Sequence, residues 1–474
     1  MSISFQDVIA TGPITVVSIV ALVVLIVETI RDKTELLTCW ISITGLVLAM
    51  IVAFTSIENT GTAYSGMVNT GGYANFFAVV FCIAGLLSTM LSKSYIQKEN
   101  IEHGEYYFLL LLAVVGMMLM AAAADLIIFF LGLELMSVTF YVMAGFVRKR
   151  QASNEAALKY FLLGAFATGF LLYGIALLYG STGTTNIESI ISRADILPPN
   201  TTFLIGLGLL LIGLAFKVAA VPFHMWVPDV YEGSPTTVSG FMSTGGKAAA
   251  FSALLLIFAP KLVNLVGPIQ EVLAVLSALS MIVGNVIAIS QTSIKRMLAY
   301  SSIAHAGYLL TGVVAANASG TKGILFYLIA YTVMNIGAFG VLSTFESKDR
   351  QNLTFDDYAG LSSKKPVLAG LMALFMFSLS GIPPFAGFFG KYYVFVGAVE
   401  AGYTWLAIVG VLMSVVSVYY YLRLVVLMYF KEQAVISEPT VSSLGLTALV
   451  ISGVAVVELG IFPSTVLNII ANFF

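Results

Sequence analysis

Apolar runs about as long as a membrane-spanning helix recur along the whole chain, separated by short polar stretches. A helix needs about 20 mostly apolar residues to cross a bilayer. Windows of that length predict spans near 13–31, 36–56, 74–93, 105–123, 124–147, 156–180, 201–228, 235–259, 268–290, 297–316, 322–344, 366–399, 403–429 and 441–461. The pattern therefore predicts an all-α polytopic membrane protein with about 14 transmembrane helices, in a single transmembrane domain over 1–474.

Prolines interrupt two of these predicted spans. Pro222 and Pro228 fall in the seventh span, and Pro383 and Pro384 fall in the twelfth. Proline removes a backbone donor, and irregular backbone at membrane depth is tolerated only inside protein or beside water. Paired breaks five spans apart are typical of transporters built from inverted repeats.

The breaks therefore predict the organisation of the chain. We expect three N-terminal helices in 1–104, a first five-helix repeat in 105–260, a second in 261–430 and a C-terminal helix in 431–474. Sequence identity between the two repeats is weak, so this prediction depends on the paired breaks.

Composition agrees with a membrane protein and argues against redox chemistry in the chain. Hydrophobic residues make up 59% and charged residues 10%, against about 25% charged in soluble domains. Cys39 and Cys82 are the two cysteines, whereas an iron–sulfur cluster usually takes four. The glycines of Ile205–Gly213 lie within a span and lack dinucleotide-loop spacing, which favours helix packing. We expect no cofactor and no metal site in this chain.

The distribution of lysine and arginine predicts an orientation. Of the 22 basic residues, fifteen lie in or beside loops after odd-numbered spans, and three lie in loops after even-numbered spans. Positively charged loops stay in the cytoplasm. We therefore expect a multi-pass protein of the bacterial cytoplasmic (inner) membrane with both termini on the non-cytoplasmic side. The remaining four basic residues lie within spans: Lys159, Lys217, Lys247 and Lys391.

Three of those lysines lie deep in their spans, and so does Glu134 in the fifth span. A lysine at mid-membrane costs roughly 2.5–3.5 kcal/mol on insertion scales, and such residues often mark proton relays. The alternative is a snorkelling or structurally paired charge. Four charges at depth favour the functional interpretation. For Lys159, near the cytoplasmic end of its span, both interpretations stay open.

Lysine suits proton transfer because burial lowers its pKa and a nearby carboxylate raises it. A Glu134–Lys217 ion pair would keep that lysine charged, and separating the pair would favour proton loss. Two histidines are secondary candidates. His224 lies between the prolines of the seventh span and His305 lies midway along the tenth. Each is either a buried, hydrogen-bonded histidine or a relay group joining Lys247 to Lys391.

Four stretches carry a resemblance to a known family. They are GLELMSVTFYVMAGF (132–146), AFKVAAVPFHMWVPDVYEGSPTTVSGFMSTGGKAAAF (215–251), QTSIKRMLAYSSIAHAGY (291–308) and SLSGIPPFAGFFGKYYVF (378–395). Together they resemble the antiporter-like membrane subunits of respiratory complex I, the proton-pumping NADH–quinone oxidoreductase, over about residues 105–430. The resemblance implies that Glu134 and Lys217 form a coupled ion pair, that Lys247 is the central relay residue and that Lys391 lies on the outlet side.

The resemblance also implies partners and cofactors. The partners would be the other membrane-arm subunits, antiporter-like paralogues and small subunits, with the peripheral arm reached indirectly and no nucleic acid involved. NADH, FMN, iron–sulfur clusters and quinone would be bound by other subunits. Two alternatives remain open: a subunit of a cation/proton (Na⁺/H⁺) antiporter complex, and a structural or assembly subunit without its own pumping.

Overall fold

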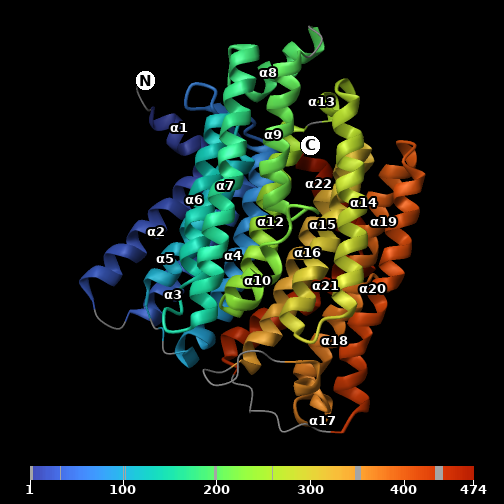
Figure 1. Ribbon diagram of the computed structural model, residues 1–474. Helices are drawn as coiled ribbons and strands as arrows, with labels where there is room; N and C mark the ends of the chain where they lie inside the picture. The colour runs from blue at the N-terminus through green and yellow to red at the C-terminus, as the bar shows by residue number, and fades with distance from the viewer. Residues whose placement is uncertain are drawn as a thin grey trace.

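The computed structural model describes residues 4–31, 34–99, 101, 103–196, 200–258, 260–346, 354–432 and 441–473. Helices that run roughly side by side make up almost all of this part of the chain (Figure 1). The fold class is therefore the one that the apolar pattern predicts. Lys33, Lys348 and Arg350, three of the residues used for the orientation, lie outside the described residues.

The N-terminal fifth of the chain contains three long helices and a short hairpin. The elements are α1 (Phe5–Ala10), α2 (Gly12–Ile30), α3 (Glu35–Thr55), β1 (Gly61–Ala63), β2 (Val68–Thr70) and α4 (Gly72–Glu99). The two strands pair antiparallel, with Gly61 opposite Thr70. α2 and α3 lie at one edge of the bundle (Figure 1) and expose apolar side chains such as Leu22 and Trp40. These faces suit a hydrocarbon environment.

The middle of the chain holds the first broken helix. Its elements are α5 (Glu105–Ala121), α6 (Leu126–Ala144), α7 (Gln151–Thr182), α8 (Ile187–Ile196), α9 (Thr201–Val218), α10 (Val227–Gly233), α11 (Thr236–Phe241), the π-helix η1 (Met242–Gly246) and α12 (Lys247–Ile257). Asp125 separates α5 from α6 because its carboxylate caps α6, accepting from the backbone N–H of Ile127 at 2.8 Å.

The last part holds the second broken helix, α18 and α19. Its elements are α13 (Pro260–Leu265), α14 (Gly267–Ile289), α15 (Ile294–Ala315), α16 (Ala318–Phe345), η2 (Phe355–Tyr358), α17 (Leu361–Lys364), α18 (Pro366–Ser380), α19 (Ala386–Glu400), α20 (Thr404–Phe430), α21 (Ser443–Ile461) and α22 (Pro463–Phe473). The predicted last span, 441–461, corresponds to α21, and a further helix, α22, follows it. Pro463 cannot continue α21 and begins α22 instead.

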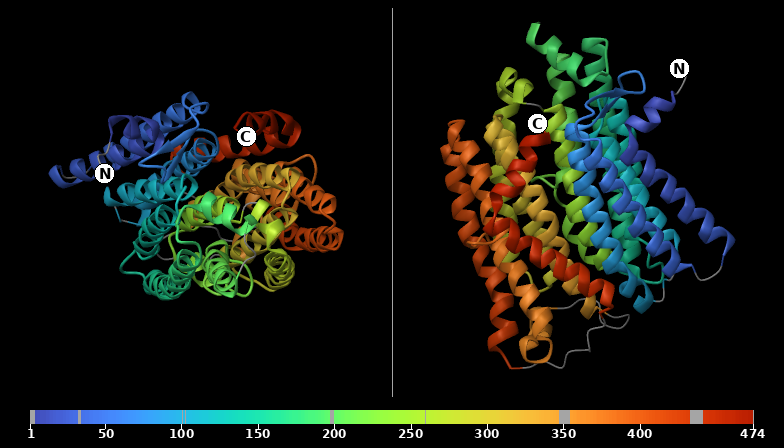
Figure 2. Two further views of the ribbon diagram at one scale, coloured as in Figure 1. Left: turned by 90° about the horizontal axis from the view of Figure 1, so that it is seen from above. Right: turned by 180° about the vertical axis from the view of Figure 1, so that it is seen from behind.

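Twelve helices of the described chain are long and apolar enough to cross a membrane, when α11, η1 and α12 are taken as one. The other two predicted spans correspond to α5, with 17 residues, and to α18 and α19, with 15 residues each. α1 and α22 lie toward the same end of the bundle (Figures 1 and 2). That this end faces the non-cytoplasmic side of the membrane stays a prediction, and so do the boundaries of the two repeats.

The innermost helices are α11 to α12, α15 and α16, which are buried on nearly all sides. The most extensive helix contacts join α14 with α15, α7 with α9, α5 with α6 and α16 with α19. Glycine permits the approach of α7 to α9. A Cβ on Gly174 would lie 2.7 Å from the carbonyl oxygen of Gly206. The glycines of 205–213 therefore include a packing residue, as predicted from their place in a span.

We expect Gly174→Ala to destabilise the protein by about 1–3 kcal/mol, because the added methyl group must push the backbones of α7 and α9 apart. The thermal unfolding midpoint of the detergent-solubilised protein measures the effect. Gly169→Ala is the matched control on the same helix, where a Cβ meets nothing within 4 Å. Equal midpoints for the two variants would contradict this account of the α7–α9 contact.

Candidate functional site

The first helix break lies between α9 and α10. Lys217 is in the last turn of α9, and Ala219 follows in the left-handed conformation with φ 65°. Side chains satisfy the freed backbone groups: Trp226 Nε1 donates to the carbonyl of Phe216 at 3.0 Å, and Ser280 Oγ accepts from the N–H of Val221 at 2.9 Å. The break is therefore held by protein groups at both of these points.

The two prolines predicted to form this break lie in different structural positions. Pro222 lies within it, between α9 and α10. Pro228 lies in the first turn of α10 and so does not interrupt a helix. A proline is tolerated there because the N–H that it lacks would have no intrahelical partner. The interpretation of Pro228 as a break is corrected accordingly.

Lys217 is buried against α6. Its Nζ donates to Ser137 Oγ at 2.7 Å and lies 5.7 Å from the ring centre of Tyr141. Glu134 lies one turn before Ser137 on α6, half-buried, and accepts from Thr168 Oγ1 at 3.0 Å. No ion pair joins Glu134 to Lys217 in the described structure, so Ser137 is the partner of the lysine on that helix.

Lys247 begins α12 directly after the π-helical turn η1. Its Nζ donates to Ser302 Oγ at 2.6 Å and to the carbonyl of the same residue. The ring of Tyr331 lies 5.7 Å away. A π-helical turn shifts the register of a helix locally, and such turns are frequent at functional sites. Lys247 is thus anchored to α15 through a single serine.

His305 lies one turn after Ser302 on α15 and is 1% exposed. Its Nδ1 is 2.7 Å from the hydroxyl of Tyr327, and its Nε2 is 3.2 Å from the hydroxyl of Tyr421. In a neutral imidazole one nitrogen donates and the other accepts. The two tyrosines therefore take opposite hydrogen-bonding roles toward a neutral ring.

Lys391 occupies the second break, where Pro383 and Pro384 separate α18 from α19. Its Nζ donates to the carbonyls of Leu379 and Ser380 at 3.1 and 2.9 Å, and to Ser414 Oγ at 2.8 Å. Leu379 and Ser380 end α18, and the last carbonyls of a helix lack intrahelical donors and carry partial negative charge. The break therefore supplies the acceptors for this ammonium group.

One face of α15 connects the two lysines. Ser302 contacts Lys247, His305 follows one turn later, and the ring of Tyr308, a further turn on, lies 4.9 Å from Lys391 Nζ. Residues three apart lie on one side of a helix. The structure thus places His305 between Lys247 and Lys391.

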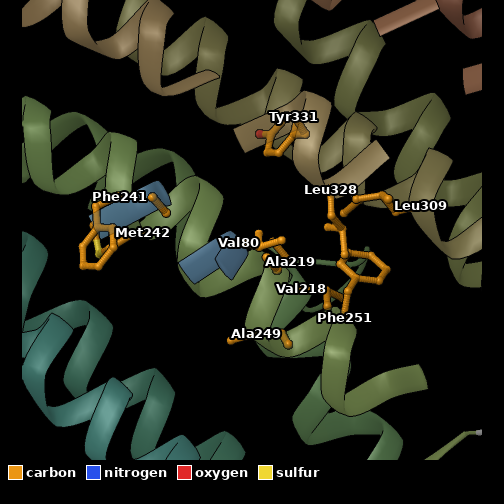
Figure 3. Close-up of a cluster of buried hydrophobic side chains, with 14 of the residues drawn as sticks. Val80, Val218, Ala219, Phe241, Met242, Ala249, Phe251, Leu309, Leu328 and Tyr331 are labelled. Atoms are coloured by element: carbon orange, nitrogen blue, oxygen red, sulfur yellow. The ribbon is translucent and has the colours of Figure 1, made fainter. Parts of the chain in front are cut away.

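Apolar packing separates the Lys217 end of α9 from this face. Figure 3 shows Val218 and Phe251 gathered with Leu309 and Leu328. All four are 0–1% exposed. The hydrogen bonds of the described residues therefore do not form one continuous chain from Lys217 to Lys391.

The remaining candidates do not contact the Ser302–Tyr308 face of α15. His224 is half-buried in the first break, and its Nδ1 has no hydrogen-bond partner among the described residues. Lys159 is half-buried and pairs with Glu155 at 2.6 Å and Asp229 at 3.1 Å. Burial alone would raise the pKa of Asp229, but hydrogen bonds from Arg296 and Lys159 hold it below its ordinary value. Lys159 thus belongs to a surface ion-pair network.

Sequence reasoning missed the neutral partners of the lysines. They are the hydroxyl and tyrosine side chains that meet them across helix contacts: Ser137, Ser302, Ser414, Tyr308, Tyr327, Tyr331 and Tyr421. The polar face of α15 could have been predicted, because Ser302, His305 and Tyr308 recur at every third position within an apolar span.

One group of described side chains has spacing compatible with a metal ion. Ligand atoms of Glu28, His103 and Glu105 lie within 4.8 Å of one another. Glu28 already accepts hydrogen bonds from the N–H of Gly104 at 2.8 Å and from Thr34 Oγ1, and the other two residues are exposed. None of these residues contacts the buried lysines.

The fold and the site together define a polytopic all-α membrane protein whose interrupted helices hold buried cations. The family described as NADH:quinone oxidoreductase/Mrp antiporter, TM, matches residues 123–417. NADH-quinone oxidoreductase subunit N of Trichlorobacter lovleyi is 49% identical over 96% of this chain and 94% of its own length. The chain therefore belongs to the NADH:quinone oxidoreductase/Mrp antiporter family, the family that its motifs resemble.

Solved structures share the whole fold. A chain of respiratory complex I from Thermus thermophilus with bound aureothin is 35% identical, with a TM-score of 0.85 over 96% of this chain and 98% of that chain. A chain of the Mrp complex from Dietzia sp. DQ12-45-1b has a TM-score of 0.86 at 19% identity, over 99% of this chain and 97% of that one. The second likeness concerns the fold alone.

We expect Ser137→Ala to destabilise the protein by about 1–3 kcal/mol, because it leaves the buried ammonium group of Lys217 without its hydrogen-bond acceptor. Thermal unfolding in detergent measures the loss. Thr139→Ala is the matched control, since Thr139 is also buried on α6 but bonds only to the carbonyl of Leu135 in its own helix. A larger effect in the control would contradict the role given to Ser137.

Proposed function

We propose that this chain is a proton-translocating N-type subunit in the membrane arm of an NADH–quinone oxidoreductase. One observation carries the proposal. Lys217, Lys247 and Lys391 are 7%, 2% and 4% exposed, and each donates only to hydroxyl or carbonyl oxygens. No carboxylate pairs with them in the described structure. A lysine whose partners are all neutral can be held as the ammonium ion or as the amine, whereas a lysine paired to a carboxylate is held as the cation.

The first step concerns Glu134 and Lys217. Ser137 lies one turn after Glu134 on α6. It accepts from Lys217 of α9 and donates to the carbonyl of Leu133 in its own helix. A modest side-chain movement would therefore bring the carboxylate and the ammonium together or apart. Bringing them together stabilises the charged lysine, and separating them favours transfer of its proton to a neighbour. In this scheme Glu134 sets the charge of Lys217.

The second step runs along α15. The proton leaves Lys247 toward Ser302, and His305 with Tyr327 and Tyr421 carries it toward Lys391. Hydroxyls and a neutral imidazole are both donors and acceptors, so they can pass a proton without holding a charge for long. The apolar contact of Val218 and Phe251 with Leu309 and Leu328 separates Lys217 from this route along α15 until water enters or side chains move.

The setting of the subunit follows from its relatives and from its charge pattern. Its partners are the other membrane-arm subunits of the complex, and it lies in the bacterial inner membrane with both termini on the non-cytoplasmic side. NADH, FMN, iron–sulfur clusters and quinone are held by other subunits, and this chain contributes no redox centre. Movement in those neighbours drives the charge changes at Glu134 and Lys217.

A second candidate function is that of a subunit in a cation/proton antiporter complex, which the shared fold with the Mrp complex chain favours. It predicts sodium-dependent proton flux without NADH. A structural subunit without pumping is the third possibility, and it predicts that the buried lysines matter only for assembly. Flux measured in membrane vesicles, together with the abundance of the assembled complex, separates the three functions.

We expect Lys247→Ala to lower coupled proton translocation on the order of 10²-fold, because it removes a positioned proton carrier. NADH oxidation with an artificial acceptor stays intact in the same membranes. Lys261→Ala is the control, since Lys261 is exposed and paired with Asp195 at 2.9 Å. Full pumping in Lys247→Ala membranes with normally assembled complex would refute the proposal.

Lys247→Arg separates proton carriage from the need for a positive charge. Arginine stays protonated in proteins, so it preserves the charge and cannot release a proton. We expect assembly at normal abundance with translocation as low as in the alanine variant. Recovery of pumping in the arginine variant would mean that Lys247 acts as a fixed charge.

A further inference from the structure

Four charged side chains are buried together at the end of the bundle where most basic loops lie. Arg150 Nη2 pairs with Glu99 Oε2 at 2.9 Å, and Lys295 Nζ pairs with Glu346 Oε1 at 3.1 Å. Their side chains are 7%, 1%, 7% and 1% exposed, respectively. We call these residues the quartet. They come from the end of α4, the start of α7, the start of α15 and the residue after α16, so the quartet joins both halves of the chain.

Each carboxylate of the quartet uses only one of its oxygens. Glu99 Oε1 and Glu346 Oε2 are buried and accept no hydrogen bond from the described residues. A buried charged oxygen without a donor costs more than an ordinary missing hydrogen bond. Buried unpaired groups of this kind are usually satisfied by ordered water or removed by protonation. Each carboxylate can therefore take a proton on its free oxygen. This neutralises the carboxylate and turns its ion pair into a hydrogen bond from the cation to a neutral carboxyl group.

Hydroxyl groups around the quartet are also unpaired. Lys295 Nζ donates to the carbonyl of Ser234 at 2.9 Å, while Ser234 Oγ itself has no partner. Thr236 Oγ1 and the hydroxyl of Tyr358 are likewise buried without a partner in the described part of the chain. The hydroxyl of Tyr95 is the sixth such oxygen. Together these groups are the donors and acceptors that a small group of bound waters needs.

The surrounding charges decide what binds. Lys98, whose Nζ donates to the carbonyl of Thr344 at 3.0 Å, adds one positive charge to the neutral quartet. The other titratable groups that face it are Tyr95 on α4, Tyr358 on η2 with its neighbour Asp357, and Glu232 on α10. The nearby cations disfavour a metal ion, and they also oppose protonation of the carboxylates. Burial of the two carboxylate oxygens without donors is what favours water and a proton here, because desolvation destabilises the charged form.

Unpaired polar groups continue from the quartet toward Lys247. α11 begins at Thr236 and leads through η1 directly to Lys247. Beside η1, Asn335 Nδ2 donates to Ser243 Oγ at 2.7 Å and to the hydroxyl of Tyr331 at 3.1 Å. Asn335 Oδ1 is buried without a partner, and the Tyr331 ring faces Lys247. Polar side chains of η1 and α16 therefore lie between the quartet and the lysine, although the hydrogen bonds of the described residues do not join the two sites.

We propose that the quartet is a second proton-binding site of this chain. Glu346 and Glu99 bind an excess proton together with ordered water, and Arg150 and Lys295 are positioning residues. The proton arrives on water from the basic end, forms an O–H bond with the free carboxylate oxygen, and leaves again to water on the side of Asn335. This inference rests on the proposed function, because the proton bound here is one that is later translocated.

Infrared difference spectroscopy of the assembled complex tests the binding directly. We expect a protonated-carboxyl C=O band that shifts in D₂O, is lost in Glu346→Gln or Glu99→Gln, and persists in the control Asp195→Asn. Asp195 is an exposed acid in an ion pair with Lys261. The same band in both glutamine variants would overturn the proposal. This readout needs no pumping, so it is independent of the proposed function.

A double variant, Lys295→Met with Glu346→Met, separates proton binding from a structural lock. Replacing a whole buried ion pair with apolar residues is often neutral for stability. We expect this variant to assemble and to lose translocation on the order of 10²-fold. Normal pumping, or failure of the double variant to assemble, would assign the quartet a structural role instead. If Lys247→Ala abolishes pumping while the double variant pumps normally, only the present inference fails.

Discussion

The burial of three ammonium groups without a carboxylate beside them is the constraint on which the rest of the structure depends. Three other lysines of the described chain pair with acids: Lys159 with Asp229, Lys261 with Asp195 and Lys295 with Glu346. Lys217, Lys247 and Lys391 instead donate to the hydroxyls of Ser137, Ser302 and Ser414 and to helix-end carbonyls. A carboxylate would stabilise each cation more strongly and would fix its charge. The neutral partners give up part of that stabilisation, and the charge stays changeable.

Helix breaks are the means by which a membrane protein provides such partners. In an intact helix every carbonyl accepts from its own backbone, and hydrocarbon provides no other acceptor. The break after Ser380 frees two carbonyls that receive Lys391, and the left-handed residue Ala219 ends α9 just after Lys217. The π-helical turn before Lys247 achieves a similar local change without a full break. Three different departures from regular helix thus accompany three lysines.

Much of the fold and several residues of the candidate site could be predicted from the sequence. Apolar windows predict the helices because membrane insertion acts on local composition. Lys217, Lys247 and Lys391 are evident in the sequence because a charge in an apolar window is conspicuous.

The partner of Lys217 could not be predicted from the sequence. Glu134 and Ser137 lie one turn apart on the same helix, and only the place where the Lys217 side chain meets α6 selects the serine. Pro228 was misinterpreted because a proline at a helix start and one within a break look alike in sequence. The quartet escaped notice because its residues lie at span ends, where charges are expected.

The central helix α15 explains how distant charges are brought under one control. It begins with Lys295 of the quartet, carries Ser302 against Lys247, and presents His305 and then Tyr308 toward Lys391. The side chains on such a buried helix cannot move independently, since close packing transmits displacements rather than absorbing them. A shift of α15 by a fraction of a turn would change the partners of a carboxylate and two lysines together. Coupling through one rigid element requires no continuous hydrogen-bonded chain, which agrees with the apolar contacts around Leu309 that interrupt it.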